Sequence, residues 1–207
     1  MENDNGMTLR EILKKYGSLS EECLQEFESQ AVMESYMRKE VIVPQGKICD
    51  SLYFTSQGLT RVAFHRGRKE DTICFGGAGD VGDVFMSFHS LYGSQKAVFS
   101  LVAITDLTCY RVSNNSFRML RQKYPDVQRW FANILMEQLY SFEELYSRLS
   151  LANPEERMRR FWDLKSDNLR AMSASQLTRV VPLKIIAQYL GMTAQTLSRV
   201  RRYLVGK

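Results

Sequence analysis

The feature that most constrains the fold of this chain is a helical segment from Asp126 to Leu151 that contains neither glycine nor proline. At 1.5 Å per residue, this segment predicts a helix about 39 Å long. Its apolar residues recur at helical spacing. They are Val127, Trp130, Phe131, Ile134, Leu135, Leu139, Phe142, Leu145, Tyr146 and Leu149. A helix so long and so apolar cannot be covered by one small β domain alone, so further protein surface must pack against it.

Part of this helix has the 3-4 spacing of a coiled-coil seam. The seam positions are Leu135, Gln138, Phe142, Leu145 and Leu149, with Gln138 as the polar member. The spacing predicts a homodimer whose two copies meet along these five residues. The alternative is a helix buried lengthwise within one monomer.

Upstream of this helix the sequence changes from helical to alternating. Residues 7–39 predict short helices broken at Gly17, with Ser18 or Ser20 capping the second. From Glu40 to Phe85, runs of four to seven alternating apolar and polar residues are separated by glycines, and residues 97–113 add two more such runs. Short strands at regular spacing indicate an antiparallel sandwich, roll or barrel, so the predicted fold class is α+β.

Signals for helix ends divide the rest of the chain. A short helix after Asn115 ends at Tyr124, because Pro125 follows it. Asn153 can cap a new helix with Pro154 at its first position, so the predicted domain boundary lies at residues 152–153. The stretch SASQLTRVV, residues 173–181, is expected to be a loop with a short extended piece.

The stretch VPLKIIAQYLGMTAQTLSRVRRYL, residues 181–204, predicts two helices joined by a tight turn. Pro182 begins the first helix, which places Leu183, Ile186, Ala187 and Leu190 on one face. Gly191 ends that helix as a left-handed residue, and Thr193 caps the next, whose inward stripe is Leu197, Val200 and Leu204. This arrangement is a helix-turn-helix.

The outward face of the second helix carries groups that pair with base edges in the major groove. These groups belong to Gln195, Ser198, Arg199 and Arg202. Phosphate contacts are expected from Lys184, Thr196 and Arg201, and the first residues of the helix, Thr193 and Ala194, are also expected at the DNA. The alternative is a structural helical hairpin with a basic exposed face. The absence of any Asp or Glu from Gln188 to Lys207 favours DNA.

Charge and composition agree with a protein that binds a polyanion at one end. The net charge of +5 divides into +7 for residues 152–207 and −2 for the remainder. A solvated basic helix face is the simpler alternative. No apolar run approaches the roughly 20 residues that span a bilayer, and the polar N-terminus is not a secretory signal, so we expect a cytoplasmic protein without a membrane partner.

Two further features limit the chemistry available to the chain. The four cysteines are scattered, which is typical of reduced thiols in a cytoplasm. Only two histidines, His65 and His89, are present, so no metal site is predicted.

The whole chain resembles the Crp/Fnr family of bacterial transcription regulators. The family's A-x-x-L-G-x-[ST]-x-x-T-[LV]-S-R signature resembles the stretch IIAQYLGMTAQTLSRVRRYL. The start of its effector-binding β-roll resembles EVIVPQGKICDSLYFTSQGLTRVAF, and its G-x-x-x-G-E segment resembles GDVGDVF. The resemblance implies an antiparallel β-roll (a double-stranded β-helix or jelly roll) with flanking helices in residues 1–115, a dimerisation helix in 116–151 and a helix-turn-helix DNA-binding domain in 152–207. The implied partners are double-stranded DNA, a second copy of the chain, a small-molecule effector and RNA polymerase.

Departures from the family pattern concern the operator and the effector. Ala194 and Gln195 stand where sugar-responsive members keep Arg and Glu, so a different operator is expected. The effector residues implied are Gly82, Asp83, Val84, Lys96 and Ala97. Asp83 can accept a ribose hydroxyl, but Lys96 supplies a point charge where cyclic-nucleotide-binding members have an arginine fork, so the expected effector is not a typical cyclic nucleotide. The aromatic stretch VFMSFHSLYG, residues 84–93, either lines a pocket or fills the roll.

Other cofactors and functions remain as alternatives. An iron–sulfur cluster would need a group of cysteines near the N-terminus, where Cys23 stands alone, and neither His65 nor His89 is placed as a haem ligand. A cupin-type metal enzyme would need converging histidines. A small-molecule sensor that acts through a protein partner is the other alternative. We therefore expect a regulator that is not an enzyme.

Overall fold

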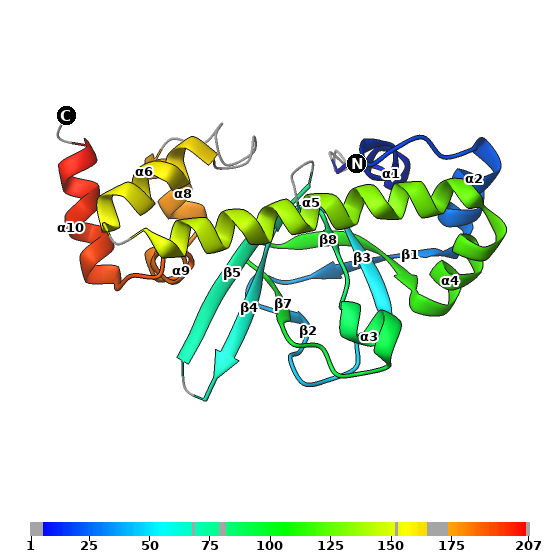
Figure 1. Ribbon diagram of the computed structural model, residues 1–207, viewed down its shortest axis with the longest axis horizontal. Coiled ribbons are helices and arrows are strands. Elements are labelled where there is room, and N and C mark those ends of the chain that lie inside the picture. Colours follow the sequence, from blue (N-terminus) through cyan, green and yellow to red (C-terminus); the bar gives the residue numbers. More distant parts are fainter. Residues whose placement is uncertain (1–5, 68, 79–81, 152, 165–173, 206–207) are drawn as a thin grey trace.

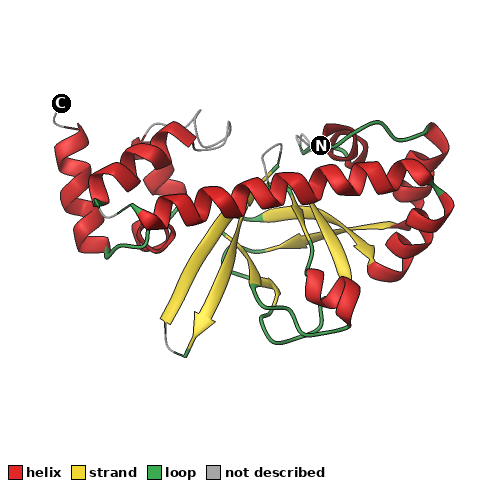
Figure 2. Cartoon of the chain, viewed as in Figure 1, coloured by secondary structure: helices red, strands yellow, loops and turns green. Residues whose placement is uncertain are grey.

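The computed structural model describes residues 6–67, 69–78, 82–151, 153–164 and 174–205. A β-roll occupies the middle of the molecule, the long helix α5 (Pro125–Ser150) runs along it, and a helical C-terminal bundle lies at the far end of α5 (Figure 1). The N-terminal helices α1 (Leu9–Lys15) and α2 (Glu21–Gln30) lie at the opposite end of α5, together with α4 (Asn114–Lys123). The α+β architecture with an antiparallel roll is therefore as predicted (Figure 2).

The roll is built from two antiparallel sheets. One has the strand order β1-β8-β3-β6 and the other β2-β7-β4-β5. The strands are β1 (Ala31–Tyr36), β2 (Val41–Val43), β3 (Ser51–Gln57), β4 (Leu59–Arg66), β5 (Lys69–Gly77), β6 (Val84–Phe85), β7 (Ser100–Ala103) and β8 (Leu107–Ser113). The two runs predicted in residues 97–113 are β7 and β8. A short helix, α3 (Phe88–Gly93), follows β6.

Strand β1 corrects one expectation, because residues 31–36 had been predicted as helix. The strand pairs with β8 from Ala31 opposite Val112 to Tyr36 opposite Leu107, at the edge of its sheet. Its burial does not alternate cleanly, and Val32 and Met33 are both about half exposed. Tertiary pairing with β8 therefore decides the conformation where the apolar pattern is ambiguous.

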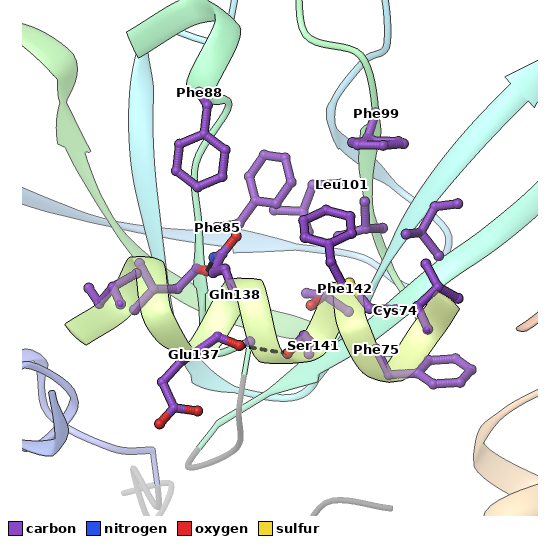
Figure 3. A pocket seen from close by; sticks show the side chains of 18 of the residues that line it. Cys74, Phe75, Phe85, Phe88, Phe99, Leu101, Glu137, Gln138, Ser141 and Phe142 are labelled. Atoms are coloured by element: carbon purple, nitrogen blue, oxygen red, sulfur yellow. Dashed lines mark hydrogen bonds between the residues drawn. The ribbon is translucent and has the colours of Figure 1, made fainter. Parts of the chain in front are cut away.

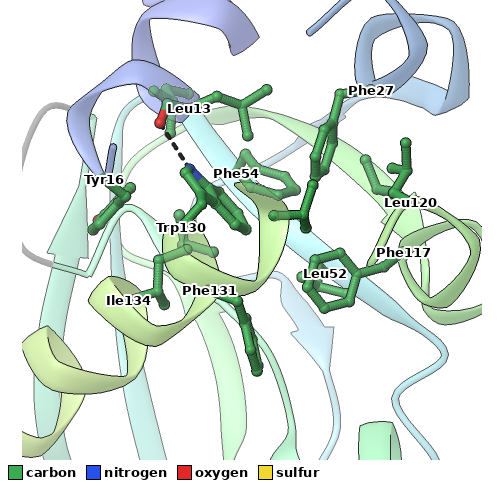
Figure 4. Close-up of a cluster of buried hydrophobic side chains, with 14 of the residues drawn as sticks. Leu13, Tyr16, Phe27, Leu52, Phe54, Phe117, Leu120, Trp130, Phe131 and Ile134 are labelled. Carbon is green, nitrogen blue, oxygen red and sulfur yellow. Dashed lines mark hydrogen bonds between the residues drawn. The ribbon is translucent and has the colours of Figure 1, made fainter. Parts of the chain in front are cut away.

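An aromatic cluster joins the roll to the first half of α5 (Figure 4). The Trp130 ring lies 5.6 Å from that of Phe27 and 6.3 Å from those of Phe54 and Phe117, between ring centroids. The Trp130 indole N–H donates to the carbonyl of Leu13 at 2.8 Å. Burying a large aromatic ring stabilises a fold by about 2–3 kcal/mol, so this cluster holds α1, α2 and α5 on the sheet.

The five predicted seam positions of α5 differ in how they face the roll, and their pairing in a dimer stays a prediction. Gln138 and Leu145 face the roll, where both line a cavity, and the Gln138 amide donates to the Val84 carbonyl at 3.2 Å. Seven large apolar residues among the described residues of the helix are exposed, and beside Met136 and Tyr140 they include five with 3-4 spacing, namely Leu135, Leu139, Phe142, Tyr146 and Leu149. We call these five residues the exposed stripe. Gln138 and Leu145 fall outside it because helix rotation is set by packing on the roll.

The C-terminal bundle consists of α6 (Pro154–Leu164), α8 (Ala174–Val180), α9 (Leu183–Tyr189) and α10 (Ala194–Val205). As predicted, Asn153 caps α6, with its side chain accepting from the Glu155 amide at 2.8 Å. The predicted loop at residues 173–181 is wrong, because α8 occupies most of it and buries Leu177. The bundle core also contacts Leu59 and Ile104 of the roll, so bundle and roll share one apolar cluster. Among the described residues, no helix is long and apolar enough to cross a membrane.

Candidate functional site

The turn between α9 and α10 has the geometry of a Schellman motif. Gly191 has φ of 61°, its amide bonds the Gln188 carbonyl at 3.0 Å, and the Met192 amide bonds the Ala187 carbonyl at 3.0 Å. Arg157 of α6 donates to the carbonyls of Leu190 at 3.1 Å and Gly191 at 2.9 Å. The angle between the two helices is thus fixed by backbone bonds and by one buttressing guanidinium group.

Helix α10 presents polar side chains to solvent over a buried apolar stripe. The Thr193 hydroxyl accepts from the Thr196 amide at 3.0 Å, which is the predicted N-cap. Leu197 and Val200 are buried in the bundle core. The exposed residues of the predicted DNA-contacting set are Thr193, Ala194, Gln195, Ser198, Arg199 and Lys184, and Thr196 is half-buried. The side chains of Arg201 and Arg202 lie outside the described part of the chain.

A second candidate site is a cavity of about 110 Å³ between the inner face of the roll and α5 (Figure 3). Its lining includes the rings of Phe85, Phe88, Phe99 and Phe142, and Phe75 borders it with its ring turned toward α9. Helix α5 closes one side with Ile134, Gln138, Ser141, Phe142 and Leu145. The aromatic stretch VFMSFHSLYG serves both predicted purposes, since Val84, Phe85 and Phe88 line the cavity while Met86 and Leu91 lie in the core.

The implied effector residues are only partly brought together. Gly82 and Val84 line the cavity, but Asp83, Lys96 and Ala97 do not. Lys96 is exposed to solvent, and Ala97 is buried in a separate cluster with Val43 and Leu101. The structure therefore places two of the five implied residues at this cavity, and their role in binding an effector stays a prediction.

The carboxylate of Asp83 already has partners within the chain. Asp83 is fully buried, the Tyr16 hydroxyl donates to its Oδ1, and Lys15 Nζ lies 3.2 Å from its Oδ2. Tyr16 also belongs to the cavity wall. No sequence pattern predicts this contact, because 67 residues separate Tyr16 from Asp83.

Comparisons with known proteins agree with this geometry. Residues 33–124 match the family model of the cyclic nucleotide-binding domain. The chain is similar to CLP of Xanthomonas campestris, described as a c-di-GMP responsive global regulator, with a TM-score of 0.70 at 18% identity over 90% of this chain and 92% of CLP. FixK2 from Bradyrhizobium japonicum gives 0.69 at 22% identity over 85% and 86%. A CooA mutant from Carboxydothermus hydrogenoformans gives 0.64 at 18% identity over 86% and 78%. No match is found among curated protein sequences.

The chain has the fold of the Crp/Fnr regulators. The matched residues 33–124 take in nearly all of the roll together with α4, and α5 begins directly after them. The cavity lies where the roll faces α5, and the exposed face of α10 belongs to the bundle beyond the end of α5 (Figure 1).

The thiols of Cys23 and Cys109 are deeply buried, and His65 has an acidic neighbour. Burial raises the pKa of the Cys23 thiol to about 12, with Asp126 and Glu26 adding to the rise. Burial likewise raises the pKa of Cys109 to about 12. His65 lies at the exposed end of β4, with Nε2 3.5 Å from a Glu70 carboxylate oxygen. Within the described residues, no group of three His, Cys, Asp or Glu is arranged to hold a metal ion.

Proposed function

We propose that this protein is a homodimeric DNA-binding transcription regulator of the Crp/Fnr type, with α10 as its recognition helix. One observation carries the proposal: Gln195, Ser198 and Arg199 are exposed together on α10, while Leu197 and Val200 anchor the same helix in the bundle. Amide and guanidinium groups at these positions can reach base edges in a major groove. Lys184 and Thr196 flank them and would contact phosphates, as would Arg201.

The charge of the bundle supports a nucleic-acid partner. No Asp or Glu occurs from Asn168 to Lys207, whereas the stretch holds the basic residues Arg170, Arg179, Lys184, Arg199, Arg201, Arg202 and Lys207. A basic stretch without acidic residues attracts a polyanion over several ångströms and does not repel it at close range.

The exposed stripe of α5 supports the homodimer. Leu139 is 51% exposed and Tyr146 78% exposed, although both lie on a helix whose opposite side is packed. Two copies of a stripe with 3-4 spacing can pack knobs into holes about a twofold axis. A dimer formed in this way would present two recognition helices to half-sites about one helical turn apart.

The cavity supports an effector site, and its position against α5 supports control of DNA binding by that effector. In this proposal the protein is a cytoplasmic regulator that acts with RNA polymerase and is not an enzyme. Effector binding would shift α5 within the dimer and thereby the spacing of the two α10 helices.

Selection from a random duplex library tests the proposed function. The purified protein should enrich a near-palindromic site with half-sites about 10 bp apart, and its affinity should fall with salt at a log–log slope of about −0.9 for each phosphate neutralised. Failure to enrich any duplex at low salt would remove the DNA-binding proposal. Enrichment of a single unrepeated half-site would retain DNA binding and contradict the dimer.

A further inference from the structure

We infer that the cavity between the roll and α5 binds a small, uncharged, apolar molecule of about the size of one aromatic ring, and not a cyclic nucleotide. This inference rests on the proposed function, because it names the chemical class of the effector. It is carried by the size of the cavity, by the charge of its lining and by the partners of Asp83.

The size and lining favour an apolar guest. At about 110 Å³, the cavity is somewhat smaller than the ~150 Å³ apolar cavity that takes up benzene in an engineered protein. Phenylalanine rings enter it from strand β6, from α3, from the segment before β7 and from α5, while the Phe75 ring of β5 points away from them (Figure 3). Such rings offer edges and faces to another ring and give no hydrogen bond to a phosphate or a sugar.

The polar groups of the α5 wall are already used within the protein. The Gln138 amide donates to the Val84 carbonyl at 3.2 Å, and the Ser141 hydroxyl donates to the Glu137 carbonyl at 3.0 Å. A guest that needs several hydrogen bonds would have to break these contacts, whereas an apolar guest leaves them intact.

The charge of the lining disfavours an anion. Among the described residues that line the cavity there is no lysine or arginine, and Glu137 is the charged one. The Glu137 carboxylate points away from the rings (Figure 3) and also borders a surface depression formed with Lys15, Gly17 and Met136. A buried phosphate without a cation is strongly unfavourable, so a cyclic nucleotide would gain nothing here to offset its desolvation.

Asp83 cannot serve a ribose without losing its own partners. The Tyr16 hydroxyl and Lys15 Nζ both lie against its buried carboxylate, and Tyr16 comes from the end of α1. Helix α1 thus occupies the carboxylate that would otherwise accept sugar hydroxyls, while the Tyr16 side chain closes the cavity wall. The remaining volume is apolar.

Thermal unfolding with matched probes tests this inference on the full chain. Toluene should raise the midpoint temperature in a dose-dependent manner, because a ligand that binds the native state stabilises it by mass action. Benzoate, which has the same ring with a carboxylate, and cyclic AMP should leave the midpoint unchanged. Stabilisation by cyclic AMP, or displacement of toluene by it, would overturn the inference. So would a lack of stabilisation by toluene.

A pair of variants locates the binding. Ser141→Leu places a larger side chain in the cavity wall, while Ser147→Leu makes the same change at an exposed position of α5. Toluene should no longer stabilise Ser141→Leu and should stabilise Ser147→Leu as it does the wild type. Equal stabilisation of both variants would place toluene elsewhere and contradict the assignment. Should Ser141→Leu fail to fold, the comparison of toluene, benzoate and cyclic AMP on the wild type decides alone.

The duplex selection separates this inference from the proposed function. If the protein enriches a palindromic site but is not stabilised by toluene, the result contradicts the apolar ligand and supports the proposed regulator. If the protein binds toluene in the cavity but enriches no duplex, the result supports the apolar ligand and contradicts the DNA partner.

Discussion

The ring of Phe75 in strand β5 lies 4.7 Å from the ring of Tyr189 in α9, between centroids, at an interplanar angle of 49°. Strand β5 thus borders both the cavity and the first helix of the helix-turn-helix, because the cavity is lined by Cys74 and Gly76 on either side of Phe75. Beside it, the Thr72 hydroxyl donates to the Gln188 side chain at 3.2 Å. The roll and the C-terminal bundle are therefore joined by this contact between β5 and α9, in addition to their covalent connection through α5.

The first prediction concerns the energy of this contact. Phe75→Leu and Tyr189→Leu each remove one ring, and the double variant removes both. A double-mutant cycle in urea should give a coupling of about 0.5–1.5 kcal/mol, the value typical of aromatic pairs. Additivity within about 0.3 kcal/mol would show that the rings do not interact.

A second prediction concerns the turn of the helix-turn-helix. Gly191 has φ of 61°, and an added Cβ would lie 2.9 Å from Leu149 Cδ2 and 3.2 Å from an Arg157 guanidinium nitrogen. Gly191→Ala should therefore cost the roughly 1 kcal/mol of left-handed strain and a smaller further amount, because both close atoms are the ends of flexible side chains that can shift. Gly67→Ala is the matched control, because Gly67 has φ of 60° with nothing within 4 Å of its Cβ position. Urea unfolding measures both, and equal costs would contradict the close approach.

The third prediction concerns the exposed stripe of α5. Leu139→Glu places a charge on the stripe, so it should convert the proposed dimer into a monomer without unfolding the roll. Ser147→Glu adds the same charge at an exposed position outside the stripe and should leave the dimer intact. Light scattering after gel filtration gives the mass of each. Dissociation by both variants, or by neither, would contradict pairing through Leu139.

The fourth prediction concerns pH. Burial raises the pKa of Cys23 and Cys109 to about 12 from an ordinary value of 9.0, so the unfolded chain ionises first as pH rises. Their contribution to stability is fully present below pH 9 and is lost between pH 9 and 12, at about 1 kcal/mol per thiol by pH 10. The free energy of unfolding should thus fall more from pH 8 to 10 in the wild type than in the Cys23→Ala/Cys109→Ala variant. Equal slopes would contradict the raised pKa values.

Local signals in the sequence predicted the helix-turn-helix accurately. Gly191 ends one helix in a left-handed conformation, and Thr193 caps the next. Both effects involve only neighbouring residues in the sequence, so both roles can be predicted from residue spacing. Most strands of the roll were predicted for the same reason, since glycines separate alternating runs.

Features that depend on distant residues could not be predicted in this way. Residues 31–36 become a strand because β8 pairs with them. The rotation of α5, which turns Gln138 toward the roll and leaves Leu139 exposed, is set by the cavity wall on the opposite side. The contact between Tyr16 and Asp83 joins α1 to the loop before β6, and no spacing rule relates them.

The most direct test of the account is the effect of Arg199→Ala on duplex binding, measured by fluorescence anisotropy at a selected site and at single-base variants of it. Arg199→Ala should cost about 1–3 kcal/mol and relax base preference at one position of each half-site, because a guanidinium fork reads a single base pair. Arg129→Ala, which removes an exposed arginine of α5 away from the helix-turn-helix, should bind like the wild type. An equal loss on every sequence would make Arg199 a phosphate contact. Unchanged affinity and unchanged base preference in Arg199→Ala would contradict α10 as the recognition helix.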